Sequence, residues 1–199
     1  MGQDMQIELD RLTDATRIQR LKAQTAGTHD TLDKRIMRAE PFANRERYAL
    51  FLDVQHRFHA DVAPLYAAAE LNRLLPGLAE RCRLEALRHD IADLGGVPEQ
   101  LGSTTGPLNP ATALGWLYVA EGSRMGATLL RKDAARLGLS DAFGARHLAP
   151  AREGPAAYWR IFTAALDAVA LDADGEARVI AGAEAAFARV QAYADDTLR

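Results

Sequence analysis

Cysteine is almost absent from this sequence, since Cys82 is the one thiol in 199 residues. A single cysteine excludes an internal disulfide framework and a cysteine-based zinc site, and it fits a reducing compartment. Long apolar runs are absent too, because no stretch reaches the roughly eighteen apolar residues of a membrane-spanning helix. The N-terminal stretch MGQDMQIELDRLTDATR is too polar for a signal peptide. We therefore expect a cytoplasmic protein with no membrane contact.

The sequence also lacks an excess of positive charge. It has 24 Lys and Arg against 27 Asp and Glu, a formal net charge of -3, so no broad basic field is available for a phosphate backbone. Nucleic acid is therefore not expected as a partner. The chain has no glycine-rich dinucleotide fingerprint, no flavin-binding signature and no iron–sulfur cysteine cluster. Redox chemistry would have to draw its electrons from another protein.

The residues that are abundant favour helix. Apolar residues make up 48% and charged residues 26% of the chain, and alanine, leucine and arginine dominate while strand formers are few. A chain of 199 residues can bury a substantial core as one unit. We therefore predict a single all-α domain over residues 1–199 with seven or eight helices, in which residues 1–13 form a loosely ordered N-terminal segment.

Apolar periodicity and the positions of Pro and Gly locate the helices. Gly27 is a weak point in the first helix, Asn44 is the expected N-cap of the second, and Pro64 should stop or kink that helix near its end. Pro110 starts a later helix at a favourable first-turn position. The helices are expected over residues 14–39, from 44 to about 64, 70–75, 78–94, from 110 onward, 158–169 and 174–195.

Two side-chain assignments follow from this pattern. The helix over 158–169 has an apolar stripe with Tyr158, Ile161 and Phe162 that should face inward. The arginines of the 78–94 helix should lie mostly on a solvated face, although one could turn towards a ligand and the sequence does not select which: Arg81, Arg83 and Arg88. The irregular stretch 95–110, with three prolines and four glycines, is expected to be a functional rim or a mobile connection.

Gly122 and Gly126, in GWLYVAEGSRMGATLLRKDA, are four residues apart in the helix that Pro110 starts. At about 3.6 residues per turn they lie on one face, and each costs roughly 0.5–1 kcal/mol relative to alanine in a helix interior. Something must therefore approach this face closely. A neighbouring helix and a flat ligand lying across the bare backbone both explain the pattern.

His29 is a candidate ligand on the first helix. Asp33 follows it by one turn and can reach the ring nitrogen that His29 does not use, and Lys22 lies two turns earlier on the same face if the helix is continuous. A lone helical histidine is more often structural than a ligand. His56 and His59, three residues apart, could share a metal, but no cysteine or glutamate completes the usual spacing.

Three separated features together resemble the bacterial heme oxygenases: AQTAGTHDTLD around His29, the stretch PFANRERYALFLDVQHRFHADVAPLY, and GWLYVAEGSRMGATLL followed by FGARHL. The likeness covers residues 17–193 and is nearest to the proteobacterial branch, which includes iron-acquisition enzymes and enzymes that supply biliverdin to bacterial phytochromes. Members of this family clasp heme between a proximal helix with the iron-ligating histidine and a distal helix kinked at glycines. The resemblance therefore implies a single-domain heme oxygenase-like fold.

The resemblance assigns the site residue by residue. It puts His29 on the iron, with Asp33 as acceptor for its other ring nitrogen. It puts Gly122 and Gly126 over the porphyrin, where bare backbone leaves room for bound dioxygen to bend towards a meso carbon. Protons would come from ordered water. The other implied positions are Ser123 and Arg83 as water anchors, Lys22 at a propionate, and Tyr118 and Phe187 as heme contacts.

The sequence departs from its relatives at two places. Mammalian-type members have a carboxylate directly after the first distal glycine, where this chain has Ser123. Members that rotate the heme grip a propionate with two lysines, where this chain has Met37 and Asp133, although Lys132 is adjacent. We therefore expect cleavage at the α-meso carbon to biliverdin, CO and ferrous iron, for iron release or for a phytochrome. Electrons would come from a separate ferredoxin-like or flavin-based reductase.

Three other functional classes remain alternatives. A heme storage or trafficking protein could use the same histidine, but it has no reason to leave the distal face open to dioxygen. A di-iron carboxylate oxidase needs Glu-x-x-His on two helices, and the nearest arrangement, Glu85 with His89, has the wrong spacing. A helical regulatory module finds little support in the acidic composition.

Overall fold

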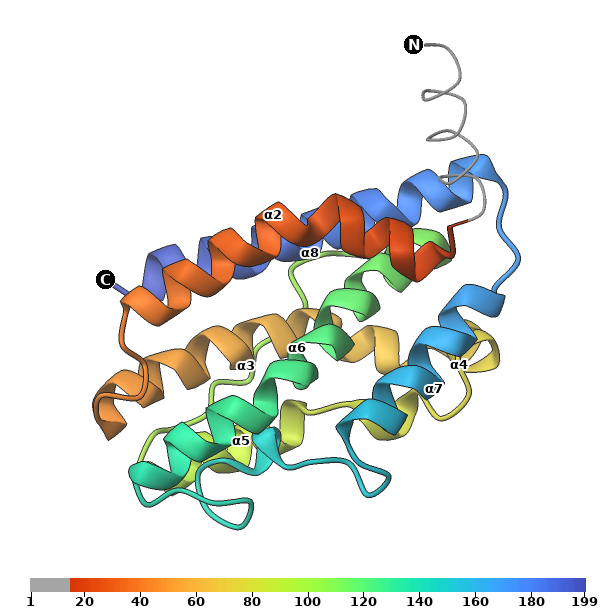
Figure 1. Cartoon of the computed structure of the whole chain (residues 1–199). Helices are drawn as coiled ribbons and strands as arrows, with labels where there is room; N and C mark the ends of the chain where they lie inside the picture. Colours follow the sequence, from red (N-terminus) through yellow and green to blue (C-terminus); the bar gives the residue numbers. More distant parts are fainter. Residues whose placement is uncertain (1–14) are drawn as a thin grey trace.

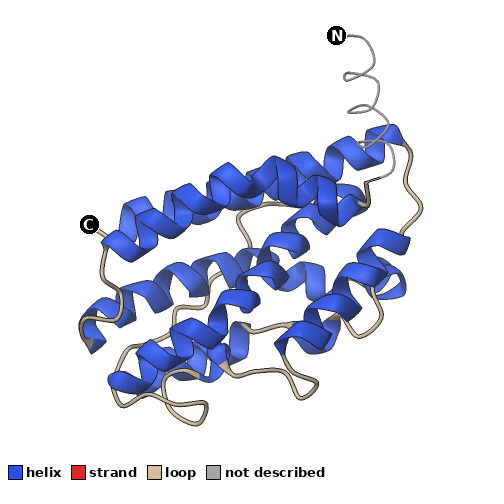
Figure 2. Cartoon of the chain, viewed as in Figure 1, coloured by secondary structure: helices blue, strands red, loops and turns tan. Residues whose placement is uncertain are grey.

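The computed structural model describes residues 15–199, so the expected loosely ordered segment 1–13 lies outside the described residues. Within that range the chain forms seven α-helices and two short 3-10 turns, and it has no β-strand (Figure 1, Figure 2). The all-α prediction is confirmed. No helix in the described part of the chain has the length and apolarity to cross a membrane. The bounds are α2 (Arg17–Arg38), α3 (Arg45–Ala67), α4 (Ala69–Leu74), η1 (Ala79–Arg81), α5 (Leu84–Asp93), α6 (Pro110–Arg136), η2 (Arg146–Leu148), α7 (Pro155–Ala168) and α8 (Ala173–Thr197).

Side-chain caps explain where the four longest helices begin. The Thr16 hydroxyl accepts from the backbone N–H of Gln19, whose side chain accepts in return from the backbone of Thr16, a capping box at the start of α2. Asn44 caps α3 as predicted. Asn109 caps α6 directly before its first proline, and Asp172 caps α8.

Two helix-breaking residues have different outcomes. The predicted weak point at Gly27 is wrong, because α2 is continuous through it. One glycine costs about 1 kcal/mol or less, and burial of Leu21 and Leu32 in the core that α2 shares with α8 outweighs that cost. Pro64 lies in the last turn of α3, which ends three residues later, so the helix stops near this proline as predicted.

The prediction of one helix over 78–94 is wrong. The chain makes the turn η1, leaves helical geometry at Cys82 with φ -61° and ψ 132°, and starts α5 at Leu84. The prediction of a solvated Arg81 is wrong as well, since its guanidinium is buried and donates to the Glu121 carboxylate and to the backbone oxygen of Tyr158. These bonds hold η1 against α6 and α7. The apolar periodicity of residues 78–94 does not predict such long-range bonds.

The centre of the fold is the contact between α6 and α8, where two glycines let the backbones touch. A Cβ on Gly115 would lie 2.1 Å from the backbone oxygen of Val179, and a Cβ on Gly182 would lie 2.2 Å from the backbone oxygen of Thr112. No other residue fits at either glycine without moving a helix. α2 lies alongside α8 (Figure 1) and adds Leu21 and Leu32 to the same core.

A second apolar cluster joins α3 and α5 to the C-terminal end of α6. Its buried members are Tyr48, Phe51, Leu52, Leu87, Ala134, Leu139, Ala145 and Leu148. On α7, Tyr158 and Phe162 face inward as predicted, but the prediction for Ile161 is wrong because this residue is 50% exposed. The buried face of α7 is therefore narrower than its apolar stripe, and α7 packs mainly on α6, with a smaller contact to α2.

Candidate active site

His29 lies on α2 with 57% of its side chain exposed. Its Nδ1 is 3.5 Å from Oδ2 of Asp33 and 3.8 Å from Oδ1 of Asp30. The ring stands edge-on to Phe187 of α8, with 6.1 Å between the ring centroids. Because the carboxylates lie on the Nδ1 side, Nε2 is the nitrogen available to a ligand. Lys22 is exposed on the same continuous helix, two turns earlier.

One stripe of α6, which we call the glycine stripe, is almost bare. Its members recur at helical spacing: Tyr118, Gly122, Met125, Gly126 and Leu129. A Cβ on Gly126 would meet no heavy atom of the described residues within 4 Å, and a Cβ on Gly122 would meet only the ring edge of Trp159, at 3.6 Å. Met125 is 42% and Leu129 67% exposed. Trp159 of α7 borders the stripe at Tyr118 and Gly122, whereas its part from Met125 to Leu129 presents backbone and apolar side chains at the surface.

The helices α2 and α6 come together where Tyr118 of α6 lies beside the side chain of Thr25 on α2. Burial at this contact raises the pKa of the Tyr118 hydroxyl, and Thr25 offsets part of the effect. His29 lies one turn beyond Thr25 on α2, and Gly122 lies one turn beyond Tyr118 on α6. The two helices diverge from this end in the ribbon view (Figure 1), so His29 and the glycine stripe belong to helices that separate along their length.

The two expected water anchors are engaged with backbone oxygens of different segments. The Ser123 hydroxyl donates to the backbone oxygen of Ala120 at 2.7 Å. The Arg83 guanidinium donates to the backbone oxygens of His147 and Ala149, which ties it to the turn after η2, and burial lowers the pKa of Arg83. The structure therefore does not bring Ser123 and Arg83 into direct contact.

A buried ion pair directly before Gly122 was missed by the sequence reasoning. Glu121 is 1% exposed and accepts from Arg81 Nη1 and from the Tyr66 hydroxyl, each at 2.8 Å. Burial raises the pKa of Glu121, and the bonds from Arg81 and Tyr66 counteract that rise. The available signal was a single glutamate inside the apolar run GWLYVAEG, which indicates a buried partner of opposite charge.

Three further histidines are buried, which the sequence patterns did not predict for all of them: His56, His59 and His147. Nδ1 of His147 lies 2.8 Å from the carboxylate of Asp90. Among the described residues, Nε2 of His56, Nδ1 of His59 and Nε2 of His147 have no hydrogen-bond partner. Burial lowers the pKa of all three rings, that of His59 to about 3 with help from His147 and Arg83. All three are therefore neutral at pH 7.

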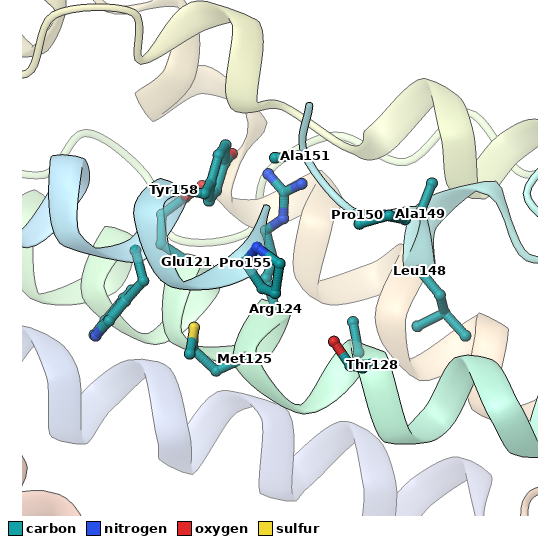
Figure 3. A pocket seen from close by; sticks show the side chains of 12 residues that line it. Glu121, Arg124, Met125, Thr128, Leu148, Ala149, Pro150, Ala151, Pro155 and Tyr158 are labelled. Carbon is teal, nitrogen blue, oxygen red and sulfur yellow. The ribbon is translucent and has the colours of Figure 1, made fainter. Parts of the chain in front are cut away.

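A hollow of about 340 Å³ lies between α6, the segment after η2 and the start of α7 (Figure 3). Arg124 reaches across it, and its guanidinium carbon stands 3.8 Å from the ring centre of Tyr158. Trp159, which touches the position of a Gly122 Cβ, also lines this hollow. It therefore lies next to the glycine stripe, on the α7 side of α6.

Comparison with known proteins agrees with this geometry. The heme oxygenase family model matches residues 15–195. Heme oxygenase PigA of Pseudomonas aeruginosa is 46% identical over 175 residues, which cover 87% of this chain and 88% of that protein. The heme oxygenase of Neisseria meningitidis, in a structure study of its NO- and CO-bound forms, aligns with a TM-score of 0.88 at 39% identity over 92% of each chain. The heme oxygenase of Leptospira interrogans shares the fold, with a TM-score of 0.73 at 17% identity over 92% of this chain and 100% of that one. The chain belongs to the heme oxygenase family.

Proposed function

We propose that this heme oxygenase opens heme at the α-meso carbon, with His29 on one face of the porphyrin and the glycine stripe on the other. The overall reaction consumes heme, dioxygen and electrons and yields biliverdin, CO and ferrous iron. One observation carries the proposal: an exposed imidazole on α2 and a bare face of α6 each lie one turn beyond the contact of Thr25 with Tyr118, on helices that diverge from that contact (Figure 1).

The residues on the α2 side suit the iron of heme. An imidazole binds iron through one nitrogen when the other is hydrogen-bonded, and Asp33 lies on the Nδ1 side of His29. Phe187 limits the tilt of the His29 ring by its edge contact. Lys22, exposed on the same helix, supplies a cation for a heme propionate.

The residues on the α6 side suit the flat, apolar body of heme. Gly122 and Gly126 have no side chains to hold the porphyrin away, and Met125 and Leu129 offer exposed apolar surface. Bound heme would supply the iron that activates dioxygen, and the nearby backbone of Gly122 and Gly126 would limit the directions in which the oxygen can bend. Tyr118 lies beside Thr25, where α2 and α6 come close, and bounds the site at that end.

Ordered water anchored by Ser123 and Arg83 supplies the protons. The Ser123 hydroxyl uses its hydrogen on the oxygen of Ala120, so its lone pairs remain free to accept from water. Arg83 has five N–H groups in general, and its two bonds to backbone oxygens leave others for water. This arrangement replaces the carboxylate that other relatives carry after the first distal glycine.

The residues near the far ends of α2 and α6 favour an unrotated heme. Met37 is 50% exposed and carries no charge, and Asp133 is paired with Arg136 at 2.7 Å. Neither can hold a propionate, and Lys132 is the single nearby lysine on α6. Lys22 on α2 therefore becomes the main propionate partner, which supports the α-meso carbon as the point of attack.

A separate reductase, ferredoxin-like or flavin-based, provides the electrons, since the chain has no motif for an electron-transfer cofactor. The biliverdin and iron serve iron release or the supply of a phytochrome, and both purposes use the same reaction. The cytoplasm is the compartment in which a reductase of either kind would meet this chain.

Aerobic turnover of the heme complex, with chromatography of the products, tests the proposal. We expect biliverdin of the α isomer, and a His29→Ala variant run in parallel should lose most of the turnover. The rival function is heme storage or trafficking, for which a stable oxygen complex without product would be the result. Such a result, or products from another meso carbon, would contradict the proposal.

A further inference from the structure

The support of α6 is uneven along its length. Its buried side chains end at Glu121, and the next buried residue is Ala134. Between them the Ser123 hydroxyl bonds back to its own helix, and the ion pair of Arg131 with Asp141 lies at the surface, 48% and 35% exposed. Ala127 and Leu130 are only partly buried against the second apolar cluster, and Arg124 stacks on Tyr158. The part of the helix with both distal glycines therefore has fully buried residues only at its two ends.

Glu121 is the anchor at the N-terminal end of this part. Its carboxylate accepts from the Tyr66 hydroxyl of α3 and from Arg81 of η1, each at 2.8 Å. The Arg81 guanidinium also donates to the backbone oxygen of Tyr158 at 3.2 Å and lies 3.7 Å from the centre of that ring. Four chain segments, α3, η1, α6 and α7, thus converge on one carboxylate, which directly precedes Gly122.

We propose that Glu121 is a positioning residue of the heme oxygenase reaction. Its bonds to Arg81 and Tyr66 fix the height and rotation of α6 at the point where the bare backbone begins. A shift of the Glu121 backbone passes directly to Gly122, because the two are neighbours in one helix. The effect on the reaction rests on the proposed position of Gly122 over heme, while the anchoring itself does not require heme.

A polar anchor is a better positioning device here than an apolar one. Replacing a buried ion pair by apolar residues of similar volume is often neutral or stabilising, so the pair is not needed for stability alone. Hydrogen bonds are directional, whereas apolar contacts tolerate small sliding and rotation. With two donors on separate elements, Glu121 can satisfy both only in one rotation of α6.

Amide hydrogen exchange of the heme-free protein tests the anchor. The variants are Tyr66→Phe, Glu121→Gln and the double variant Glu121→Met with Arg81→Met, which leaves no unpaired charge and is expected to fold. We expect exchange in residues 122–130 to rise by about tenfold or more in the double variant, because loss of the anchor lowers the free energy of local opening. Residues 111–120 should change far less. The double variant keeps the test valid if Glu121→Gln fails to fold.

The control is Glu176→Gln, which removes a carboxylate partner from the buried Arg17, 2.7 Å away on α2. It should lower the midpoint of thermal unfolding without a selective increase in the amide exchange rate of residues 122–130. In heme-loaded protein, the double variant should yield a broader mixture of biliverdin isomers at similar heme affinity, whereas the control keeps the wild-type distribution. The wild-type distribution is the reference, so the comparison does not depend on which carbon wild type attacks. Exchange no greater than in the control, or increased exchange with unchanged isomers, would overturn the positioning role.

Discussion

Nδ1 of His29 lies 3.5 Å from Oδ2 of Asp33, on successive turns of α2. Both side chains are more than half exposed, so their mutual attraction adds little stability. The carboxylate instead favours the tautomer with hydrogen on Nδ1 and leaves the lone pair of Nε2 for iron. We therefore propose separable roles for the two residues, His29 as the iron ligand and Asp33 as its orienting partner.

The first prediction concerns the ligand. His29→Ala should lose the imidazole-ligated absorption spectrum of the heme complex and most of the turnover, because the other four histidines lie on other helices or turns. His89→Ala, at an exposed histidine of α5, is the matched control and should behave as wild type. An unchanged spectrum in His29→Ala would remove this residue from the site.

The second prediction concerns the orienting carboxylate. Asp33→Asn should keep the imidazole-ligated spectrum but lower heme affinity by about tenfold, the low end of the range for a partner that orients a metal ligand, because the pair is exposed. Heme titration followed by visible absorption measures the change. The control is Asp30→Asn, whose carboxylate is farther from the ring, at 3.8 Å. Equal losses in both variants would assign the effect to general charge.

The third prediction separates two kinds of glycine on α6. Gly122→Leu should leave the helical content and the thermal midpoint close to wild type, since a Cβ there meets only the Trp159 ring edge at 3.6 Å, yet it should displace heme or stop its oxidation. Gly115→Ala should instead destabilise the fold by about 3 kcal/mol or more, because its Cβ would lie 2.1 Å from a backbone oxygen of α8. Circular dichroism melts and heme titration measure both. Full activity in Gly122→Leu would refute the close approach of heme.

The fold could be predicted where local signals decide it. Asn44, as a side-chain N-cap, and Pro110, as a first-turn proline, predicted the starts of α3 and α6, and both helices begin at these residues. The start of α5 could not be read in this way. The turn η1 before it is held by Arg81, whose partner Glu121 is 40 residues away along the chain, and no helical period in residues 78–94 carries that information.

The candidate site was only partly accessible from the sequence. Motifs around His29 and Gly122 indicated the family, which the comparisons then established. The spacing of Gly122 and Gly126 could not distinguish a helix partner from a ligand. In the structure the close backbone contact between helices occurs at Gly115 and Gly182, whereas a Cβ on Gly126 would meet no heavy atom of the described residues within 4 Å. Such contact depends on which helices meet, and that is a property of the whole core.

The last prediction concerns the pH dependence of stability. His59 is buried, and burial together with His147 and Arg83 lowers its pKa to about 3. A histidine in the unfolded chain has a pKa of about 6.5. Between these values the unfolded chain binds a proton that the folded chain does not. The contribution of His59 is therefore fully present above pH ~6.5 and is lost as pH falls towards 3, at up to about 1.4 kcal/mol per pH unit.

Urea unfolding of the heme-free protein measures this slope. The range from about pH 5 to about pH 7.5 includes the pKa of an unfolded histidine. His59→Leu should reduce the pH dependence by about one proton, while His89→Leu, at an exposed site, should leave it unchanged. Hydrogen bonds from His147 and Arg146 outweigh burial and lower the pKa of Asp90, so this carboxylate stays ionised and does not contribute within the range. Equal slopes for wild type and His59→Leu would show that the ring takes up its proton in the folded state, against the burial described here.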